Sequence, residues 1–162
     1  MNLGGLKNHK DQLISIKHLT LIGSGTSGHA AMLGVKYFQN ISGFDTVRFI
    51  DASEFTLADV ADKSAGVLLL SQSGETRDVY RCLEIIREAR PNIPIFSIVN
   101  VVESLIAREV DCGVYLHAGR EVGVASTKSF TNQIIILMLL VSNLEPQLLK
   151  TLVLRPKKVG FQ

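Results

Sequence analysis

The sequence has few of the residues that mark several large classes of protein. Its 162 residues include two cysteines and no tryptophan, and the formal net charge is only +2. Cys82 and Cys112 show no metal-type spacing and fall in apolar stretches, so we expect both to be buried rather than disulfide-bonded or metal-bound. A charge so close to zero, without a basic stripe, argues against a nucleic-acid partner.

Long apolar segments are missing as well. The longest run, residues 134–141, is far shorter than the about 20 apolar residues that a membrane-spanning helix needs. The first residues contain no apolar signal core, so we predict neither a secretion signal nor membrane association. With 46% hydrophobic and 20% charged residues, the composition is that of a globular protein of single-domain size, which we expect to be cytoplasmic.

Short apolar runs alternate with segments of helical spacing along most of the chain. This alternation is typical of an α/β domain with a mostly parallel sheet. Right-handed crossovers bring the carboxyl ends of all strands to one edge, where such domains bind their ligands. We expect strands at 18–23, 46–50, 66–70, 93–99 and 112–117, and helices at 27–39, 53–60, 75–90, 104–109 and 126–143.

Three parts are predicted along the chain. Residues 1–17 form a lead-in with at best a short surface helix, 18–145 form the domain, and 146–162 form a basic tail that is a frayed end or the start of a linker. The last helix is apolar on nearly all sides, so more than one of its faces must be buried. We expect one face to meet the sheet and another to meet a second domain or subunit; the alternative is a helix buried centrally in this domain.

The strongest candidate site is the segment that follows the buried run 67–70. Small polar residues there lie between a strand end and a helix start, where free N–H groups and the positive end of the helix dipole attract anions. Neutral hydroxyl and amide groups suit phosphate oxygens, but the same residues could simply close a turn and cap the helix. Glu75, in the same turn, is expected to point away and interact with the helix dipole. The four candidate residues are Ser71, Gln72, Ser73 and Thr76.

A glycine-rich loop follows the first predicted strand. Its pattern, Gly23-x-Gly25-x-x-Gly28, fits the dinucleotide fingerprint, and Asp51 ends the second strand about where a ribose-binding acid would stand. A nicotinamide dinucleotide is therefore one hypothesis. A dinucleotide domain needs no second phosphate-binding loop after its third strand, however. One compact phosphate ester held from both loops accounts for both patterns.

Three further polar residues near this edge are weaker candidates. Lys128 lies in the first turn of the last helix, where the helix dipole disfavours a cation, and it is either solvated or has a structural or substrate-facing role. His29 follows the glycine-rich loop and is expected to pack or to orient its helix. His117 ends the fifth strand without an evident partner.

Three motifs together resemble those of the SIS (sugar isomerase) domain family. More narrowly, the chain is similar to the first of the two SIS domains in the glucosamine-6-phosphate synthases, the glutamine–fructose-6-phosphate aminotransferases. The first two motifs recur widely among SIS domains, and the third is more specific to the synthase group. The motifs are Gly25-Thr26-Ser27, Ser71-Gln72-Ser73-Gly74-Glu75-Thr76 and Glu121-Val122-Gly123-Val124-Ala125-Ser126-Thr127-Lys128.

The resemblance implies a three-layer, flavodoxin-like fold with a five-stranded parallel sheet and helices on both faces. It also implies a site for fructose 6-phosphate or glucosamine 6-phosphate at the strand ends, with no cofactor or metal. By the family pattern, the segment from Ser71 to Thr76 holds the phosphate. The remaining substrate-binding residues that the resemblance implies are Thr26, Ser27, Val124 and Ser126.

The sequence departs from the family pattern in two positions and in its extent. Ser24 stands where the synthases usually have cysteine, and Gly28 where they usually have tyrosine. Nothing corresponds to their glutaminase domain or to the second SIS domain that supplies the glutamate base. We therefore expect a fragment of such a synthase, or a stand-alone domain or sugar-phosphate sensor, without catalytic residues of its own. The last helix is expected to contact a second SIS domain or a second copy in a homodimer.

Overall fold

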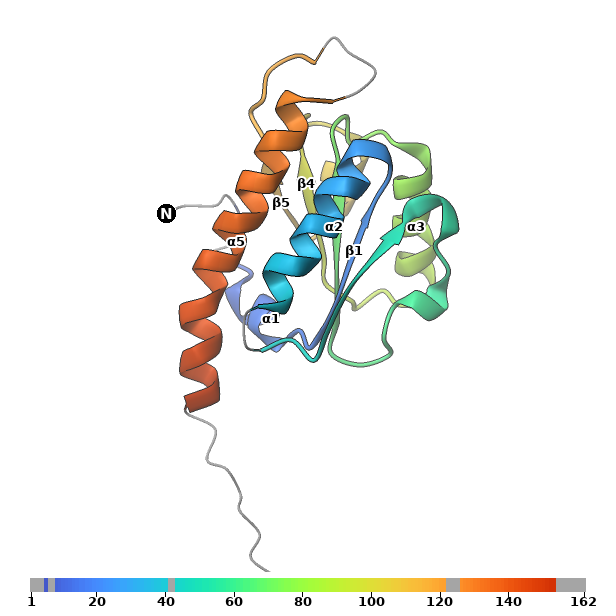
Figure 1. Cartoon of the computed structure of the whole chain (residues 1–162). Coiled ribbons are helices and arrows are strands. Elements are labelled where there is room, and N and C mark those ends of the chain that lie inside the picture. The colour runs from blue at the N-terminus through green and yellow to red at the C-terminus, as the bar shows by residue number, and fades with distance from the viewer. Residues whose placement is uncertain (1–4, 6–7, 41–42, 122–125, 154–162) are drawn as a thin grey trace, which may run out of the picture.

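Five strands form a single parallel sheet at the centre of the molecule (Figure 1). The computed structural model describes residues 5, 8–40, 43–121 and 126–153. The strand order β2-β1-β3-β4-β5 is flavodoxin-like, and it reverses between β1 and β3, where a ligand site is expected. The strands are β1 (His18–Gly23), β2 (Thr46–Asp51), β3 (Ala65–Ser71), β4 (Ile95–Val99) and β5 (Cys112–Tyr115).

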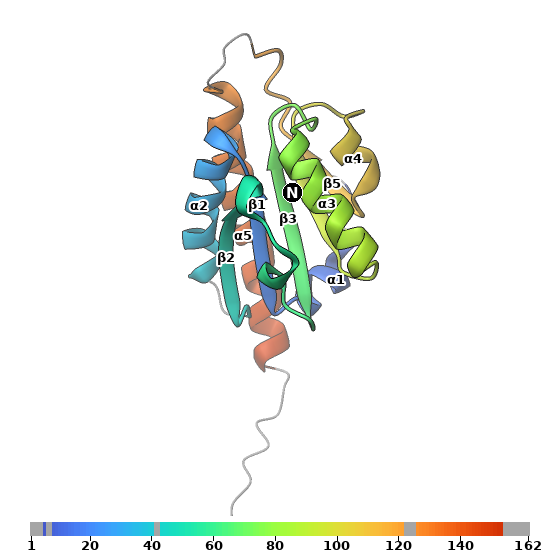
Figure 2. The same ribbon diagram turned by 90° about the vertical axis from the view of Figure 1, so that its right-hand side faces the viewer.

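Helices cover both faces of this sheet. Figure 2 shows α2 and α5 on one side and α3 and α4 on the other, so the predicted three-layer α/β architecture is confirmed. No helix among the described residues is both long and apolar enough to cross a membrane. The helices are α1 (Lys10–Ser15), α2 (Gly25–Gln39), α3 (Arg77–Ala89), α4 (Leu105–Glu109) and α5 (Lys128–Val153), with two short 3-10 helices at Ala52–Glu54 and Leu57–Asp59.

The core is divided in two by the sheet, and β3 contributes to both halves. Every residue of β3 is buried. Because side chains alternate along a strand, Leu68 and Leu70 pack with the cluster under α2 and α5, whereas Val67 and Leu69 pack with the cluster under α3. This burial on both faces is why the strand is continuously apolar.

A glycine brings α2 unusually close to its neighbours. A Cβ atom added at Gly34 would lie 2.9 Å from the side chain of Leu21 in β1 and 3.1 Å from that of Leu137 in α5. The first separation is too short for two carbon atoms and the second is tight, so a larger residue would require the two leucine side chains to shift. The glycine thus fixes how tightly α2 and α5 pack on this face.

Four expectations about elements were wrong. Strand β5 ends at Tyr115, two residues earlier than predicted. The predicted helix 53–60 is two separate 3-10 helices, because the carboxylates of Asp51 and Asp59 bond nearby backbone N–H groups and compete with a regular helix. Strand β4 begins two residues later than predicted, directly after Pro94. Helix α5 continues past Pro146 to Val153 rather than ending at residue 143; the leucines at 144, 148, 149 and 152 keep the helical spacing, and it was Pro146 that favoured an earlier end.

The lead-in segment contributes to the core although its helix is short. Residue Ile16 follows α1 and is only 1% exposed. It lies over Gly66 of β3, where an added Cβ would be 2.8 Å from the Ile16 Cγ1 atom. The side chain therefore seals the end of the sheet that lies opposite the strand carboxyl ends.

Candidate functional site

Two loops flank the point where the strand order reverses. The first follows β1 and leads into α2, and the second follows β3 and leads into α3. Neither helix has a side-chain cap on its first N–H groups. In addition, the Ser24 hydroxyl before α2 is buried without a hydrogen-bond partner among the described residues. Backbone donors from both faces of the sheet are therefore open at one place, which favours an anion.

The loop after β3 is held by its own hydroxyl groups. The Gly74 N–H donates to the Ser71 Oγ atom at 3.0 Å, and the Glu75 N–H donates to the Ser73 Oγ atom at 3.1 Å. The Ser71 and Thr76 hydroxyls are 2.9 Å apart. The predicted turn is thus present. A hydroxyl that accepts a backbone N–H keeps its own proton, so the turn leaves donors for a ligand.

The residues predicted to bind substrate differ in exposure and in the hydrogen bonds that their side chains make. Ser71 is buried, whereas Gln72, Ser73, Thr76 and Thr26 are half-buried at the same edge. The side chains of Gln72 and Thr26 make no hydrogen bond within the part of the chain that the structure describes.

Ser27 has a second, structural task. It is buried in the first turn of α2, and its hydroxyl accepts a hydrogen bond from the Gln133 Nε2 atom at 2.9 Å. Gln133 belongs to α5, so this bond joins the two helices on one face of the sheet. No local sequence pattern indicates this pairing, because it connects residues far apart in the chain.

The third motif is only partly within the structure. Ser126 is half-buried just before α5, whereas Val124 lies outside the described residues. Glu121 caps α5: its carboxylate accepts the N–H groups of Thr127 at 3.1 Å, Lys128 at 3.3 Å and Ser129 at 3.0 Å. The Ser129 and Thr127 bonds are the main reasons why the pKa of Glu121 falls from 4.5 to about 2. A carboxylate of the protein thus already occupies the anion position at α5.

Glu75 interacts with a helix, as expected, but with a different one. Its Oε1 atom accepts the N–H of Leu105 at 2.9 Å, at the start of α4 rather than of α3. The carboxylate is thereby turned away from the α3 N-terminus, where it would repel a bound anion.

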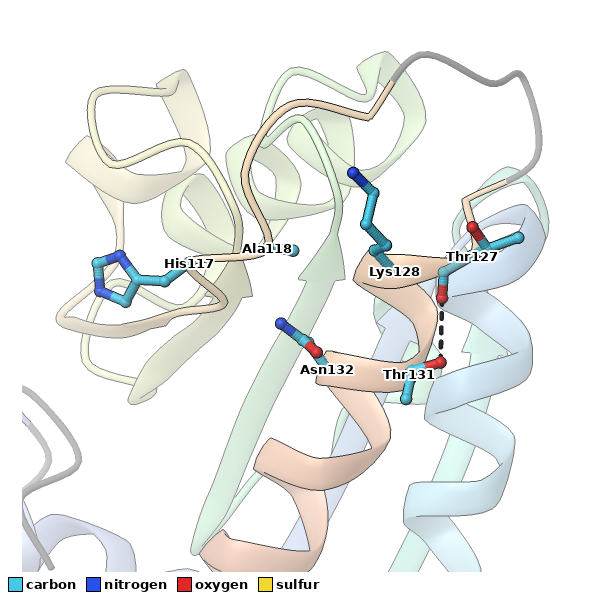
Figure 3. Close-up of a pocket in the computed structure, with 6 residues that line it drawn as sticks. All are labelled: His117, Ala118, Thr127, Lys128, Thr131 and Asn132. Atoms are coloured by element: carbon cyan, nitrogen blue, oxygen red, sulfur yellow. Dashed lines mark hydrogen bonds between the residues drawn. The ribbon is translucent and has the colours of Figure 1, made fainter.

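A hollow of about 470 Å³ opens beside the third motif, between the loop after β5 and the first two turns of α5 (Figure 3). In Figure 3 the side chains of Lys128 and Asn132 reach toward that loop, and His117 points away from α5. The Lys128 Nζ atom donates to the Arg120 carbonyl at 3.1 Å, so this lysine braces the loop. The hollow is lined by His117, Ala118, Thr127, Lys128, Thr131 and Asn132.

Two further expectations are not supported. The carboxylate of Asp51, which the dinucleotide hypothesis needs for a ribose, accepts both the N–H and the hydroxyl of Ser53. The strand order is also not that of the dinucleotide fold, which runs 3-2-1-4-5-6. His29, expected to pack or to orient its helix, is exposed, so it does not pack.

Fold and edge together define a flavodoxin-like α/β domain in which hydroxyl-lined loops and two open helix N-termini flank the topological switch point. The model of one family, described as "SIS domain", matches residues 12–143. The chain therefore belongs to the SIS domain family.

Curated relatives are similar over most of this chain. A protein of Acanthamoeba polyphaga mimivirus, named "Probable glutamine–fructose-6-phosphate aminotransferase [isomerizing]", is 47% identical over 126 residues, which are 77% of this chain and 20% of that protein. The glutamine–fructose-6-phosphate aminotransferase of Chlorobaculum tepidum is 39% identical over 141 residues, 86% of this chain and 22% of that one. The chain thus spans about a fifth of the length of these relatives.

Solved structures agree with the fold. The C-terminal domain of glucosamine-fructose-6-phosphate aminotransferase from Francisella tularensis superimposes with a TM-score of 0.74 at 29% identity, covering 90% of this chain and 43% of that chain. A crystal structure from Bacteroides fragilis has a TM-score of 0.78 at 22% identity and covers 98% of this chain and 84% of that one. The second comparison supports the fold alone.

Proposed function

We propose that this domain binds a hexose 6-phosphate, either fructose 6-phosphate or glucosamine 6-phosphate, at the edge between β1 and β3. One observation carries the proposal: two uncapped helix N-termini and a hydroxyl-rich loop meet where the strand order reverses. A phosphate monoester, with its double charge, fits such a set of neutral donors. The names of the relatives, which are aminotransferases of fructose 6-phosphate, agree with this ligand.

In this proposal the two loops take different ends of the ligand. Ser71, Gln72, Ser73 and Thr76 hold the phosphate, with the N–H groups of α3 behind them. Thr26 and Ser27 at the start of α2, and Val124 and Ser126 before α5, contact the sugar. The hollow lined by Thr127 and Lys128 lies beside the segment that carries Ser126.

Catalysis is a separate question. Aldose–ketose isomerisation moves a proton between adjacent carbons and needs a general base. We propose no general base among the residues that the structure describes at this site. We therefore propose binding without conversion for the isolated chain, either as part of a larger synthase or as a sugar-phosphate sensor. The predicted cytoplasmic location stays a prediction.

Calorimetry tests the ligand. Fructose 6-phosphate, glucosamine 6-phosphate and NAD are titrated into the chain, and we expect heat of binding from the sugar phosphates but not from NAD. Binding of NAD alone would contradict the proposal and restore the dinucleotide hypothesis. An isomerisation assay run in parallel separates the two roles, because detectable turnover would show that the chain carries its own base.

The side chains of the phosphate loop are tested by Ser73→Ala and Thr76→Ala. Each variant should weaken binding of fructose 6-phosphate by about 1.5–3 kcal/mol, the range for a hydrogen bond to a charged group. Ser142→Ala, which removes an exposed hydroxyl on α5, serves as the control and should bind normally. If both loop variants keep the wild-type affinity, these two side chains do not belong to the site.

An apolar surface on α2 and α5 supports the predicted partner. The two helices pack side by side on one face of the sheet (Figure 1). Met32 and Leu33 of α2 are 51% and 40% exposed, and Ile135 and Met138 of α5 are 48% and 50% exposed. We propose that these four side chains contact a second SIS domain. For the isolated chain, the second SIS domain available is another copy, so we expect a homodimer.

Sedimentation velocity tests this contact. The double variant Ile135→Glu/Met138→Glu should sediment as a monomer, because buried glutamates in the contact are costly. The matched control is Val101→Glu/Val102→Glu, which places the same two charges at apolar positions that are 44% and 50% exposed, on the loop after β4. A wild-type chain that is monomeric at high concentration would overturn the self-association.

A further inference from the structure

One residue joins three of the loops at the strand carboxyl ends. Asn100 follows β4 directly, and its backbone N–H donates to the carbonyl of Gln72 in the phosphate loop at 3.1 Å. Its side chain turns the other way: Nδ2 donates to the Gly119 carbonyl at 2.8 Å, and Oδ1 accepts the Ala118 N–H at 2.8 Å. Asn100 is therefore the link between the loop after β3 and the loop after β5.

The segment that Asn100 holds is strained where it leaves the sheet. His117 has a φ of 49° and Gly119 has a φ of 70°, both in the left-handed region. A non-glycine residue keeps such a conformation only where its surroundings impose it. The two side-chain hydrogen bonds of Asn100 go to the backbone of Ala118, which lies between these two residues, and of Gly119, which is one of them. They therefore fix the direction in which the chain continues.

The other end of the same segment is fixed by Glu121. Its carboxylate accepts three consecutive N–H groups at the start of α5, from Thr127 to Ser129. The depressed pKa of Glu121 keeps this carboxylate charged throughout the neutral range. The loop after β5 is thus attached to α5 at its end and, through Asn100, to the phosphate loop at its start.

We infer that Asn100 is a positioning residue that sets the distance between the phosphate-binding loop and the residues at the sugar end of the ligand. The inference rests on the proposed function. The phosphate and the far hydroxyls of a hexose 6-phosphate are a limited distance apart. They can be bound at the same time only when the two loops are held at the matching distance. Preorganisation of this kind raises affinity by lowering the ordering cost of binding. Asn100 itself touches no ligand in this arrangement.

A substitution with nearly the same shape separates this role from simple packing. Asn100→Asp keeps an oxygen to accept the Ala118 N–H but places a second oxygen against the Gly119 carbonyl, where a donor is needed. Asn100→Ala removes both side-chain bonds and keeps the backbone bond to Gln72. Thr20→Val is the matched control, because it removes one side-chain bond, to the Asp59 carbonyl, away from the strand carboxyl ends.

The decisive measurement is a ratio of two affinities. Fructose 6-phosphate and inorganic phosphate are titrated into the wild type and the three variants. We expect both Asn100 variants to bind fructose 6-phosphate about tenfold more weakly, within the range of typical coupling energies, and to bind phosphate almost normally. Thr20→Val should leave the ratio unchanged. Equal losses for both ligands, or no loss for either, would overturn the inference.

A ligand-free readout keeps the inference distinct from the proposed function. Hydrogen exchange of the Ala118 amide should be faster in Asn100→Ala than in Thr20→Val and the wild type, because the Ala118 N–H loses its acceptor and local opening then costs less; Asn100→Asp, which keeps an acceptor, should change it less. Unchanged exchange there would overturn the inference even if sugar phosphates bind. A wild type that binds neither ligand would overturn the proposed function and the ligand part of this inference, and exchange alone would then decide whether Asn100 holds the loop.

Discussion

Replacing Gly74 with alanine is expected to destabilise the domain by about 2–4 kcal/mol, because two costs add. Gly74 has a φ of 68°, a left-handed conformation that L-residues adopt only at a cost. An added Cβ would also lie 2.5 Å from the Cβ atom of Ser104, which precedes α4. Since Ser104 is buried, it has no room to move away. Urea denaturation measures the loss directly.

Two control variants separate the cost of the left-handed backbone conformation from the cost of the collision with Ser104. Gly25 and Gly119 also have left-handed φ values, but a Cβ added at either would have no atom within 4 Å. Their alanine variants should therefore lose only about 1–2 kcal/mol, the conformational part alone. Adding Ser104→Gly to the Gly74→Ala variant removes the colliding side chain, and it should therefore recover the stability lost to the collision. If Gly74→Ala is no less stable than Gly25→Ala, the collision with Ser104 is not real.

The Gly74 variant should also lose its ligand. The Gly74 N–H donates to the Ser71 hydroxyl, and this bond shapes the loop that we propose for phosphate. A shift of the backbone there moves the hydroxyls of Ser73 and Thr76 with it. We expect fructose 6-phosphate binding to disappear under conditions in which the variant is still folded, as judged by circular dichroism.

Truncation of Ile16 is the second large effect. Ile16→Ala should destabilise the domain by about 2–5 kcal/mol, the range for deleting a buried isoleucine side chain to alanine. The side chain is 1% exposed, and the three atoms nearest to a Cβ added at Gly66 of β3 all belong to it. Thermal unfolding measures the loss. Ser15→Ala, an exposed neighbour, should change the melting temperature little.

The Ile16 result bears on where the folding unit begins. We predicted a domain of residues 18–145 preceded by a lead-in. If Ile16→Ala is as costly as expected, a shortened chain that starts at His18 should lose at least the same free energy. We therefore propose that the unit extends to the lead-in. A chain from His18 with wild-type stability would keep the original boundary.

Much of the fold was predictable because it is encoded locally. A continuous run such as 67–70 has no solvent-facing position and therefore predicts a strand buried on both faces. The helical stripe that includes Val79, Cys82 and Ile86 is buried as its spacing predicts. The loop from Ser71 to Thr76 was found by the same local logic, since a strand end and a helix start meet there.

The features that the sequence did not reveal depend on distant partners. The strand order, the hydrogen bond from Gln133 to Ser27 and the side-chain bonds of Asn100 each join segments that only the folded chain brings together. An asparagine after a strand predicts a turn and nothing more. The length of α5 was missed because proline usually ends a helix, and this helix continues through Pro146.

The bond between Gln133 and Ser27 has a mechanical consequence. Sliding α5 along its own axis would leave a buried amide unpaired, at a cost of about 1–3 kcal/mol. This bond therefore opposes sliding of α5 relative to α2. A displacement of α5 would therefore also pull on the first turn of α2. Binding of a partner on the outer surface of α5 and binding of a ligand at the strand ends would thus act on the same backbone segment.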